Sequence, residues 1–208
     1  EAAGLFPAGE PARRWKASGH VEYPAAPASK FFRPVAYVDP VGQRTEVREY
    51  RDYFLLLDRI RDAAGNDLTV TAFDFRVVAP CEIRDINGNL SAVAFDRLGL
   101  VAGSAVMGKG GQGDTLAGFN PDPTDAAVDA FFADPLGQAR ALLGRASTRV
   151  VVDHRHQPNW SAVIGRAMHD ADEVAAGVQG QIQIAFDYTD GLGRIALRKL
   201  LAEPGEAL

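Results

Sequence analysis

The chain has 208 residues, of which 47% are hydrophobic and 24% are charged, and its formal net charge is −5. This length allows one domain or two small ones, and it is enough to bury a hydrophobic core. The charge is spread along the sequence, which argues against a nucleic acid or an anionic membrane as partner, because both attract a basic stripe.

No apolar run approaches the length needed to span a bilayer, so we expect no direct membrane insertion. The first residues have neither a starting Met nor the plan of a signal peptide, and the sequence is interpreted as a piece of a longer protein. The single cysteine, Cys81, excludes an internal disulfide framework and a multi-cysteine metal site. We expect it to be a small buried hydrophobic residue in a strand.

Residues 1–34 are rich in Gly, Pro and Ala and predict an irregular N-terminal segment that packs on a sheet. A short strand is expected at 20–23. Trp15, Phe31 and Phe32 are the expected anchors of this segment on the sheet.

Residues 35–106 contain a phrase repeated every 23 residues, which predicts stacked β-hairpins. Its copies are Asp39-Pro-Val-Gly-Gln, Asp62-Ala-Ala-Gly-Asn and Asp85-Ile-Asn-Gly-Asn. An Asp side chain can accept a hydrogen bond from the backbone two residues on, and Gly supplies the positive φ of the turn. The expected turn glycines are Gly42, Gly65 and Gly88. Calcium binding by the three carboxylates is the less favoured alternative, because calcium loops gather several oxygens in one short segment.

Runs of β-forming residues follow each phrase and end near an aromatic residue. The expected strands are 45–54, 68–75 and 90–95, with returning strands at 55–60, 77–83 and 100–106. This pattern predicts a mainly β fold, an antiparallel meander of repeated hairpins forming a curved sheet, with one short helical insertion. The repeat aromatics are Tyr50, Phe73 and Phe95, joined later in the chain by Tyr188. They are expected to pack across neighbouring strands; if exposed in a row, they would instead favour glycan binding.

Residues 107–146 predict a flexible loop followed by short helices. The Gly-rich run around Lys109 lacks the spacing of a phosphate-binding loop. Thr124 or Asp125 can cap a first helix, and Asp134-Pro135 can begin a second that ends at Gly144.

Residues 147–208 predict further β-hairpins. Residues 181–188 alternate between apolar and polar, and a turn containing Asp190 and Gly193 follows. The stretch 162–168 fits either a helix or a strand.

One cluster could carry chemistry: Asp153, His154 and His156, with His169 as a distant further ligand. Two His residues two apart on a strand share a face and can chelate a metal. The neighbouring Arg and Gln-Pro instead favour a strand end that runs into an exposed loop. We therefore assign no catalytic residue, no cofactor-binding residue and no metal ligand, and expect no enzyme.

Several longer phrases resemble the middle-to-C-terminal region of the B component of bacterial insecticidal toxin complexes, with tyrosine-aspartate (YD) repeats of the Rhs type. They are Phe31-Phe-Arg-Pro, Asp39-Pro-Val-Gly, Asp85-Ile-Asn-Gly-Asn-Leu-Ser-Ala-Val-Ala-Phe-Asp-Arg-Leu-Gly-Leu-Val-Ala-Gly-Ser-Ala-Val-Met-Gly-Lys109, Phe186-Asp-Tyr-Thr-Asp-Gly-Leu-Gly-Arg194 and Lys199-Leu-Leu-Ala-Glu-Pro-Gly205. The resemblance runs from about Trp15 to Gly205.

The resemblance implies a structural segment of a secreted or extracellular toxin complex. In that family the B component and an Rhs-type C component form a hollow β-sheet shell around a toxic effector. A channel-forming A component binds other parts of the B component. The alternative is a glycan- or protein-binding repeat module on a secreted or cell-surface protein.

Overall fold

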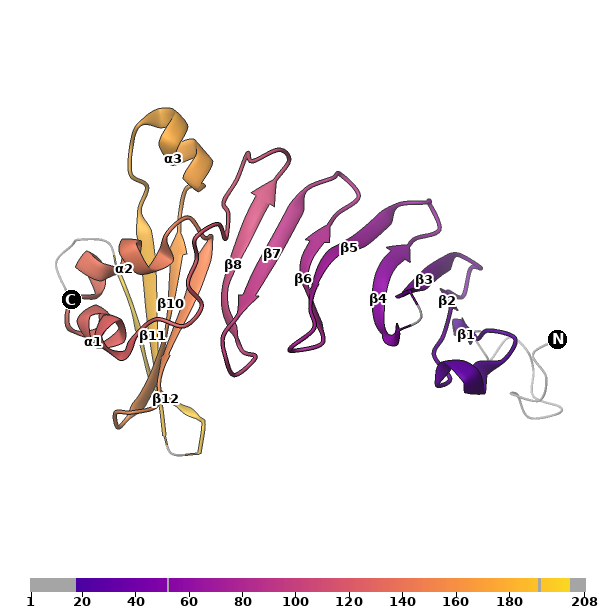
Figure 1. The fold of residues 1–208 in the computed structure, drawn as a ribbon, viewed down its shortest axis with the longest axis horizontal. Helices are drawn as coiled ribbons and strands as arrows, with labels where there is room; N and C mark the ends of the chain where they lie inside the picture. The colour runs from indigo at the N-terminus through magenta and orange to yellow at the C-terminus, as the bar shows by residue number, and fades with distance from the viewer. Residues whose placement is uncertain (1–17, 52, 191, 203–208) are drawn as a thin grey trace. The chain divides into compact units, whose positions relative to one another are not determined.

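A computed structural model describes residues 18–51, 53–190 and 192–202. Twelve strands form one antiparallel meander in which the strand order β1 to β12 follows the sequence (Figure 1). The mainly β class predicted from the repeats is confirmed. The chain divides into two compact units, one up to Thr69 and one from Val70, and each is described by itself.

The first unit holds the first four strands, a short 3-10 helix and the beginning of the fifth strand. These elements are β1 (His20–Glu22), η2 (Pro27–Lys30), β2 (Ala36–Val38), β3 (Arg44–Tyr50), β4 (Tyr53–Arg61) and β5 (Asp67–Asp74). Its buried hydrophobic residues are Ala36 and Leu56. Ion pairs between neighbouring strands support the sheet, with Arg48 on Asp58 at 2.7 Å and Arg61 on Asp67 at 2.6 Å.

The structure supports the expected anchoring role for Phe31 and not for Phe32. The Phe31 ring lies 6.3 Å from the ring of Phe54 on β4, although 71% of Phe31 remains exposed. Phe32 is 67% exposed, and both residues have a φ of 53° in the left-handed turn after η2, where Phe32 N donates to Pro27 O. Trp15 lies outside the described residues.

The second unit holds the remaining strands and three α-helices. Its elements after β5 are β6 (Ala79–Arg84), β7 (Leu90–Phe95), β8 (Val101–Gly108), α1 (Asp125–Ala133), α2 (Pro135–Leu143), β9 (Thr148–Asp153), β10 (Asn159–Arg166), α3 (Asp170–Ala176), β11 (Ile182–Thr189) and β12 (Ile195–Leu200). Helices α1 and α2 form the predicted insertion. Helix α3, between β10 and β11, was not predicted, and most of the ambiguous stretch 162–168 belongs to β10.

Local signals explain where α1 and α2 begin. Thr124 Oγ1 accepts a hydrogen bond from Ala127 N at 3.3 Å. Asp134 Oδ1 accepts one from Gly137 N at 3.0 Å, and Pro135 occupies the first turn of α2. These caps satisfy backbone donors that have no partner inside the helix.

The hydrophobic core lies where α1 and α2 cover one face of β9, β10 and β11. Phe131 is fully buried, and its ring stacks on Phe186 with 5.5 Å between centroids and lies 6.3 Å from Trp160. Ile184 and Ala162 complete the strand side, as the alternation of β11 predicts. In contrast, every residue of β7 is only half-buried, so both faces of that strand remain partly open.

Phe131→Ala is expected to destabilise the second unit by about 3–5 kcal/mol, because it removes the ring at the centre of the core. Urea unfolding followed by the fluorescence of Trp160 measures the loss. Leu136→Ala is the matched control: Leu136 lies on α2 and is 65% exposed, so its truncation should cost less than about 1 kcal/mol. Equal losses for the two variants would contradict this placement of the core.

Candidate functional site

The repeated phrase forms one turn geometry, which occurs five times among the described residues. In each copy the Asp Oδ1 accepts hydrogen bonds from the backbone N of the second and fourth following residues, and the Gly N donates to the Asp carbonyl. The copies begin at Asp39, Asp62, Asp85, Asp96 and Asp190. Their glycines have φ between 79° and 88°, a conformation that Gly adopts without strain.

The carboxylates of these turns are occupied by donors of their own turn. In the turn at Asp85, the bonds to Asn87 N and Asn89 N measure 2.9 and 2.8 Å, and Asn89 Nδ2 donates to the second oxygen at 2.9 Å. The side-chain bond from Asn89 is the main cause that lowers the pKa of Asp85. The carboxylates therefore act as turn caps in this geometry, and the donors compete with any bound calcium ion.

The turn that begins at Asp96 was not recognised as a copy. The period of 23 does not include it, because Asp96 follows Asp85 by 11 residues. The signal was present in the sequence as Asp-x-x-Gly, which Asp96-Arg-Leu-Gly99 satisfies.

The repeat aromatics do not form an exposed row. The structure places Tyr50, Phe73, Phe95 and Tyr188 in half-buried positions. The Tyr188 ring stacks on Phe186 with 6.2 Å between centroids, at the edge of the core, and Lys199 Nζ lies 4.9 Å from its centroid.

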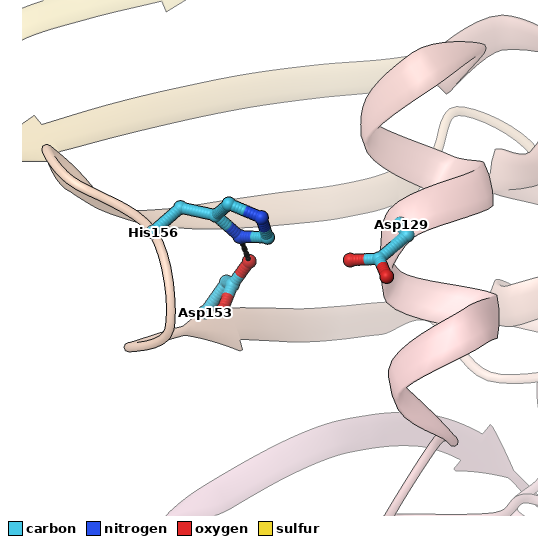
Figure 2. Close-up of side chains that lie close together, drawn as sticks. All are labelled: Asp129, Asp153 and His156. Atoms are coloured by element: carbon cyan, nitrogen blue, oxygen red, sulfur yellow. Dashed lines mark hydrogen bonds and ion pairs between the residues drawn. The ribbon is translucent and has the colours of Figure 1, made fainter.

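Figure 2 shows the densest group of possible metal ligands, formed by Asp129 on α1, Asp153 at the end of β9 and His156 in the following turn. One ligand atom from each lies within 4.8 Å of the others. His156 Nδ1 lies 2.5 Å from Asp153 Oδ2. The Asp153 side chain is buried at 1% exposure, whereas His156 is 61% exposed.

Arg155 supplies the positive charge of this group. Its Nη2 donates to Asp129 Oδ1 at 2.6 Å, and its backbone N and Nε donate to Asp153 Oδ1 at 2.8 and 3.1 Å. Burial alone would raise the pKa of Asp153, but hydrogen bonds from the Arg155 backbone, His156 and the Arg155 side chain lower it to about 2. The bonds to Asp153 and Asp129 raise the pKa of Arg155.

The geometry explains why His154 and His156 do not bind a metal ion together from one face of a strand. Strand β9 ends at Asp153, so the two His residues lie in a bend and do not share a strand face. His169 lies elsewhere, 3.0 Å from Asp114 Oδ2. Because the Arg155 guanidinium already binds both carboxylates, a cation there would have to displace it. The group fixes the β9–β10 turn to α1.

A buried polar network around Asp114 was missed entirely. Asp114 Oδ1 accepts from Asp170 N at 2.6 Å, and Asp114 Oδ2 accepts from Ser147 Oγ. Burial opposes ionisation of Asp114, yet the bonds from Ser147, Asp170 and His169 lower its pKa. Arg166, 2% exposed, lies 3.6 Å from Asp114.

The same network attaches α3 to the second unit. Arg166 Nη1 lies 3.5 Å from both Asp170 and Glu173, and Arg140 Nη1 donates to Glu173 at 2.8 Å. The flexible loop expected after residue 107 is therefore wrong at Asp114, which is buried.

The sequence could not indicate this network, because no short motif links Asp114 with partners that lie more than thirty positions away.

No family model and no curated protein matches this chain. Solved structures do match it. The crystal structure of TcdB2-TccC3 matches with a TM-score of 0.60 and 19% identity, over 86% of this chain and 8% of that chain. The crystal structure of TcdB2-TccC3-TEV matches with a TM-score of 0.64 and 17% identity, over 88% and 11%.

The structure of the Photorhabdus luminescens Tc holotoxin pore with the TccC3-D651A mutation matches with a TM-score of 0.55 and 16% identity, over 86% of this chain and 10% of that chain. The chain thus spans about a tenth of the length of the solved chains it matches. Its fold is that of a part of these Tc toxin structures.

Gly88→Ala is expected to cost about 1–2 kcal/mol, because Ala must adopt the left-handed φ of the Asp85 turn. An added Cβ would meet only Lys109 Cε at 3.8 Å, so the cost is conformational. Gly165→Ala in β10 is the control, because its Cβ meets nothing within 4 Å and its φ lies outside the left-handed region. Thermal unfolding compares the two; equal effects would refute the role of φ.

Asp153→Asn is expected to destabilise the second unit by roughly 1–2 kcal/mol at pH 7. The folded pKa of about 2 lies below the ordinary 3.8, so the contribution of Asp153 is present above about pH 5 and is lost as the pH falls toward 2. The stability difference between wild type and variant should therefore shrink over that range in urea unfolding.

The control for this pH dependence is Asp172→Asn, because Asp172 is exposed on α3. Its stability difference from wild type should stay small, because an exposed substitution usually changes the free energy of unfolding by less than about 0.5 kcal/mol. A constant difference for Asp153→Asn over the same range would argue against an ionised Asp153 in the folded state.

Proposed function

We propose that this chain forms part of the wall of a hollow β-sheet shell that encloses a toxic effector before translocation, in a protein like the B component of insecticidal toxin complexes. The observation that carries the proposal is the fold match to TcdB2-TccC3 structures over 86–88% of this chain. The phrases that resemble YD repeats, Phe95-Asp96 and Tyr188-Thr-Asp190, support the same conclusion.

The architecture suits a wall. Each internal strand pairs with its neighbours in sequence over at least part of its length, which covers strand edges as the meander grows. The half-buried residues of β7 fit a sheet with two partly open faces better than the centre of a solid globule. The Asp turns repeat one connection geometry, which favours regular stacking of hairpins.

The proposed role is mechanical and needs no catalytic residue, metal or cofactor. The proposed partners are an Rhs-type C component and the effector it contributes, with a channel-forming A component bound through other parts of a longer protein. The proposed location is outside the producing cell. Nucleic acid binding and direct membrane insertion are not part of the role. Among the described residues, no helix is long and apolar enough to cross a membrane.

The decisive experiment is co-expression of the full-length protein with its Rhs-type partner, followed by purification and electron microscopy. We expect a closed hollow particle in which density for β1 to β12 lies in the wall. A matched preparation without the partner should lack the closed particle. Separate solid particles from the co-expression would contradict the proposal.

The chain expressed alone is expected to self-associate through β12. All six residues of β12 are exposed, and β12 is the last strand of the described sheet. An unprotected strand edge pairs readily with another chain. Light scattering after size exclusion should show a mass that rises with concentration.

Leu197→Lys should reduce this association, because a charge on an edge strand opposes pairing. Leu192→Lys is the control, since Leu192 is 79% exposed in the turn before β12. A monodisperse wild-type monomer at high concentration would contradict the prediction, as would equal effects of the two substitutions.

A further inference from the structure

The sheet of the second unit opens between β8 and β9. The ladder that joins these strands holds two residue pairs, Gly103 with Arg149 and Ser104 with Thr148. Beyond it, β8 extends to Val101 and β9 extends to Asp153 without pairing to each other. Figure 1 shows β8 and β10 diverging toward this end. We name the opening between residues 100–102 and 150–153 the β8–β9 wedge.

Strand β9 has an unpaired backbone edge in the wedge. Its other edge pairs with β10, for example Val150 with Val163 and Val152 with Ser161. A strand directs its N–H and C=O groups alternately to its two sides. Half of these groups in residues 150–153 therefore face the wedge, where the described part of the chain provides no neighbouring strand.

The wedge is a cavity lined by both apolar and charged side chains. Its volume is about 320 Å³. Its floor contains the buried residues Ala102, Val128 and Val151. Its walls include Val101, which is 46% exposed, and Val152. Valine side chains beside an unpaired strand edge match the recognition of extended peptides, in which the backbone pairs and alternate side chains enter pockets.

The loop before α1 is fixed beside the wedge at two points. At the ladder, the Arg149 guanidinium lies 4.6 Å from the Phe119 ring centroid and donates to Asn120 O at 2.7 Å. At the mouth, Asp122 Oδ1 accepts from Arg97 N at 3.0 Å, which ties the β7–β8 turn to this loop. The loop contributes Pro121, Asp122 and Pro123 to the lining, and an incoming strand need not separate a formed ladder between β8 and β9.

The charge of the wedge favours a basic ligand. The carboxylates that line it are Asp96, Asp122, Asp125 and Asp153, against the two guanidiniums of Arg97 and Arg155. Asp125 is the most accessible of the acids, with a side chain that is 80% exposed, and its Oδ2 lies 3.4 Å from Arg155 Nη1. The formal charge of the lining residues is thus negative, and the exposed carboxylate, Asp125, lies at the mouth of the wedge.

We propose that the β8–β9 wedge binds an extended peptide that adds as a strand to the free edge of β9, with apolar residues at alternate positions and Lys or Arg at its ends. The peptide backbone would pair with residues 150–153, its apolar side chains would contact Val101 and Val152, and its basic ends would lie near Asp125. This binding surface does not depend on the shell assignment.

The test uses the whole chain and a labelled synthetic peptide, Lys-Val-Thr-Val-Thr-Val-Lys, blocked at both ends. Fluorescence anisotropy should show saturable binding, and hydrogen exchange should slow at residues 150–153. A peptide methylated on alternate backbone nitrogens should bind at least about ten-fold more weakly, because it cannot form the ladder. A version with Glu in place of Lys should also bind more weakly, and less so at high salt.

Val101→Lys should weaken binding at least about ten-fold, because it places a charge on the apolar wall. Val163→Lys is the matched control: Val163 is 43% exposed, but both edges of its strand are paired, so binding should stay within about two-fold. Circular dichroism confirms that both variants fold.

Three outcomes would overturn the proposal. They are no saturable binding to the folded wild-type chain, equal binding of the methylated peptide, and protection from exchange at β12 in place of β9.

Discussion

The stack of Phe131 on Phe186 beside Trp160 is the interaction on which the second unit depends. A single sheet cannot bury both faces of its strands, and two packed layers are the usual solution. Helices α1 and α2 provide the second layer over β9 to β11. Ile164 and Leu143 are fully buried there, whereas the residues of β7 reach only half-burial. Strands away from this core rely on backbone ladders and on their turns.

The Asp turns supply much of what those strands need. Each turn satisfies several backbone donors with one carboxylate and fixes the connection between two strands, which removes alternative registers. Cross-strand pairs add to this: Arg198 on Asp187 joins β12 to β11, and Thr71 donates to Glu82 between β5 and β6. Regularity of the sheet thus follows from local chemistry repeated along the sequence.

The difference between local turn contacts and long-range contacts also decides which features could be predicted from the sequence. The turns at Asp62 and Asp85, and the strands that follow them, depend on neighbours within five residues, so a pattern in the sequence is enough to place them. The network of Asp114 with Ser147 and Asp170 brings together residues far apart in the chain, and it holds the unpredicted helix α3. Its members carry no spacing that distinguishes them from surface residues.

The Asp153 group shows the same limit in a candidate site. The sequence pattern groups Asp153, His154 and His156, but the strand ends at Asp153, and His154 is not a member of the group in the structure. Asp129, from a helix more than twenty residues earlier, takes its place. No pattern in the sequence indicates that Arg155 binds both carboxylates. The Arg155 guanidinium occupies both carboxylates, so the group joins the β9–β10 turn to α1 and is not free to chelate a metal.

The β8–β9 wedge lies where a ladder of the second unit ends early; the β6–β7 ladder is short as well, with three residue pairs. Internal strands of a meander normally pair along both sides, and an unpaired edge is a hazard that proteins cover or charge. Here the contact of Arg149 with Phe119 and that of Asp122 with Arg97 fix the loop before α1 beside the two strands. Gly103 fits this arrangement, because a Cβ at that position would lie 2.4 Å from the Phe119 ring. Gly103 belongs to the last residue pair of the ladder, and only Gly allows the Phe119 ring to come this close to the strand. The position of the opening therefore follows from the packing of Phe119 on β8.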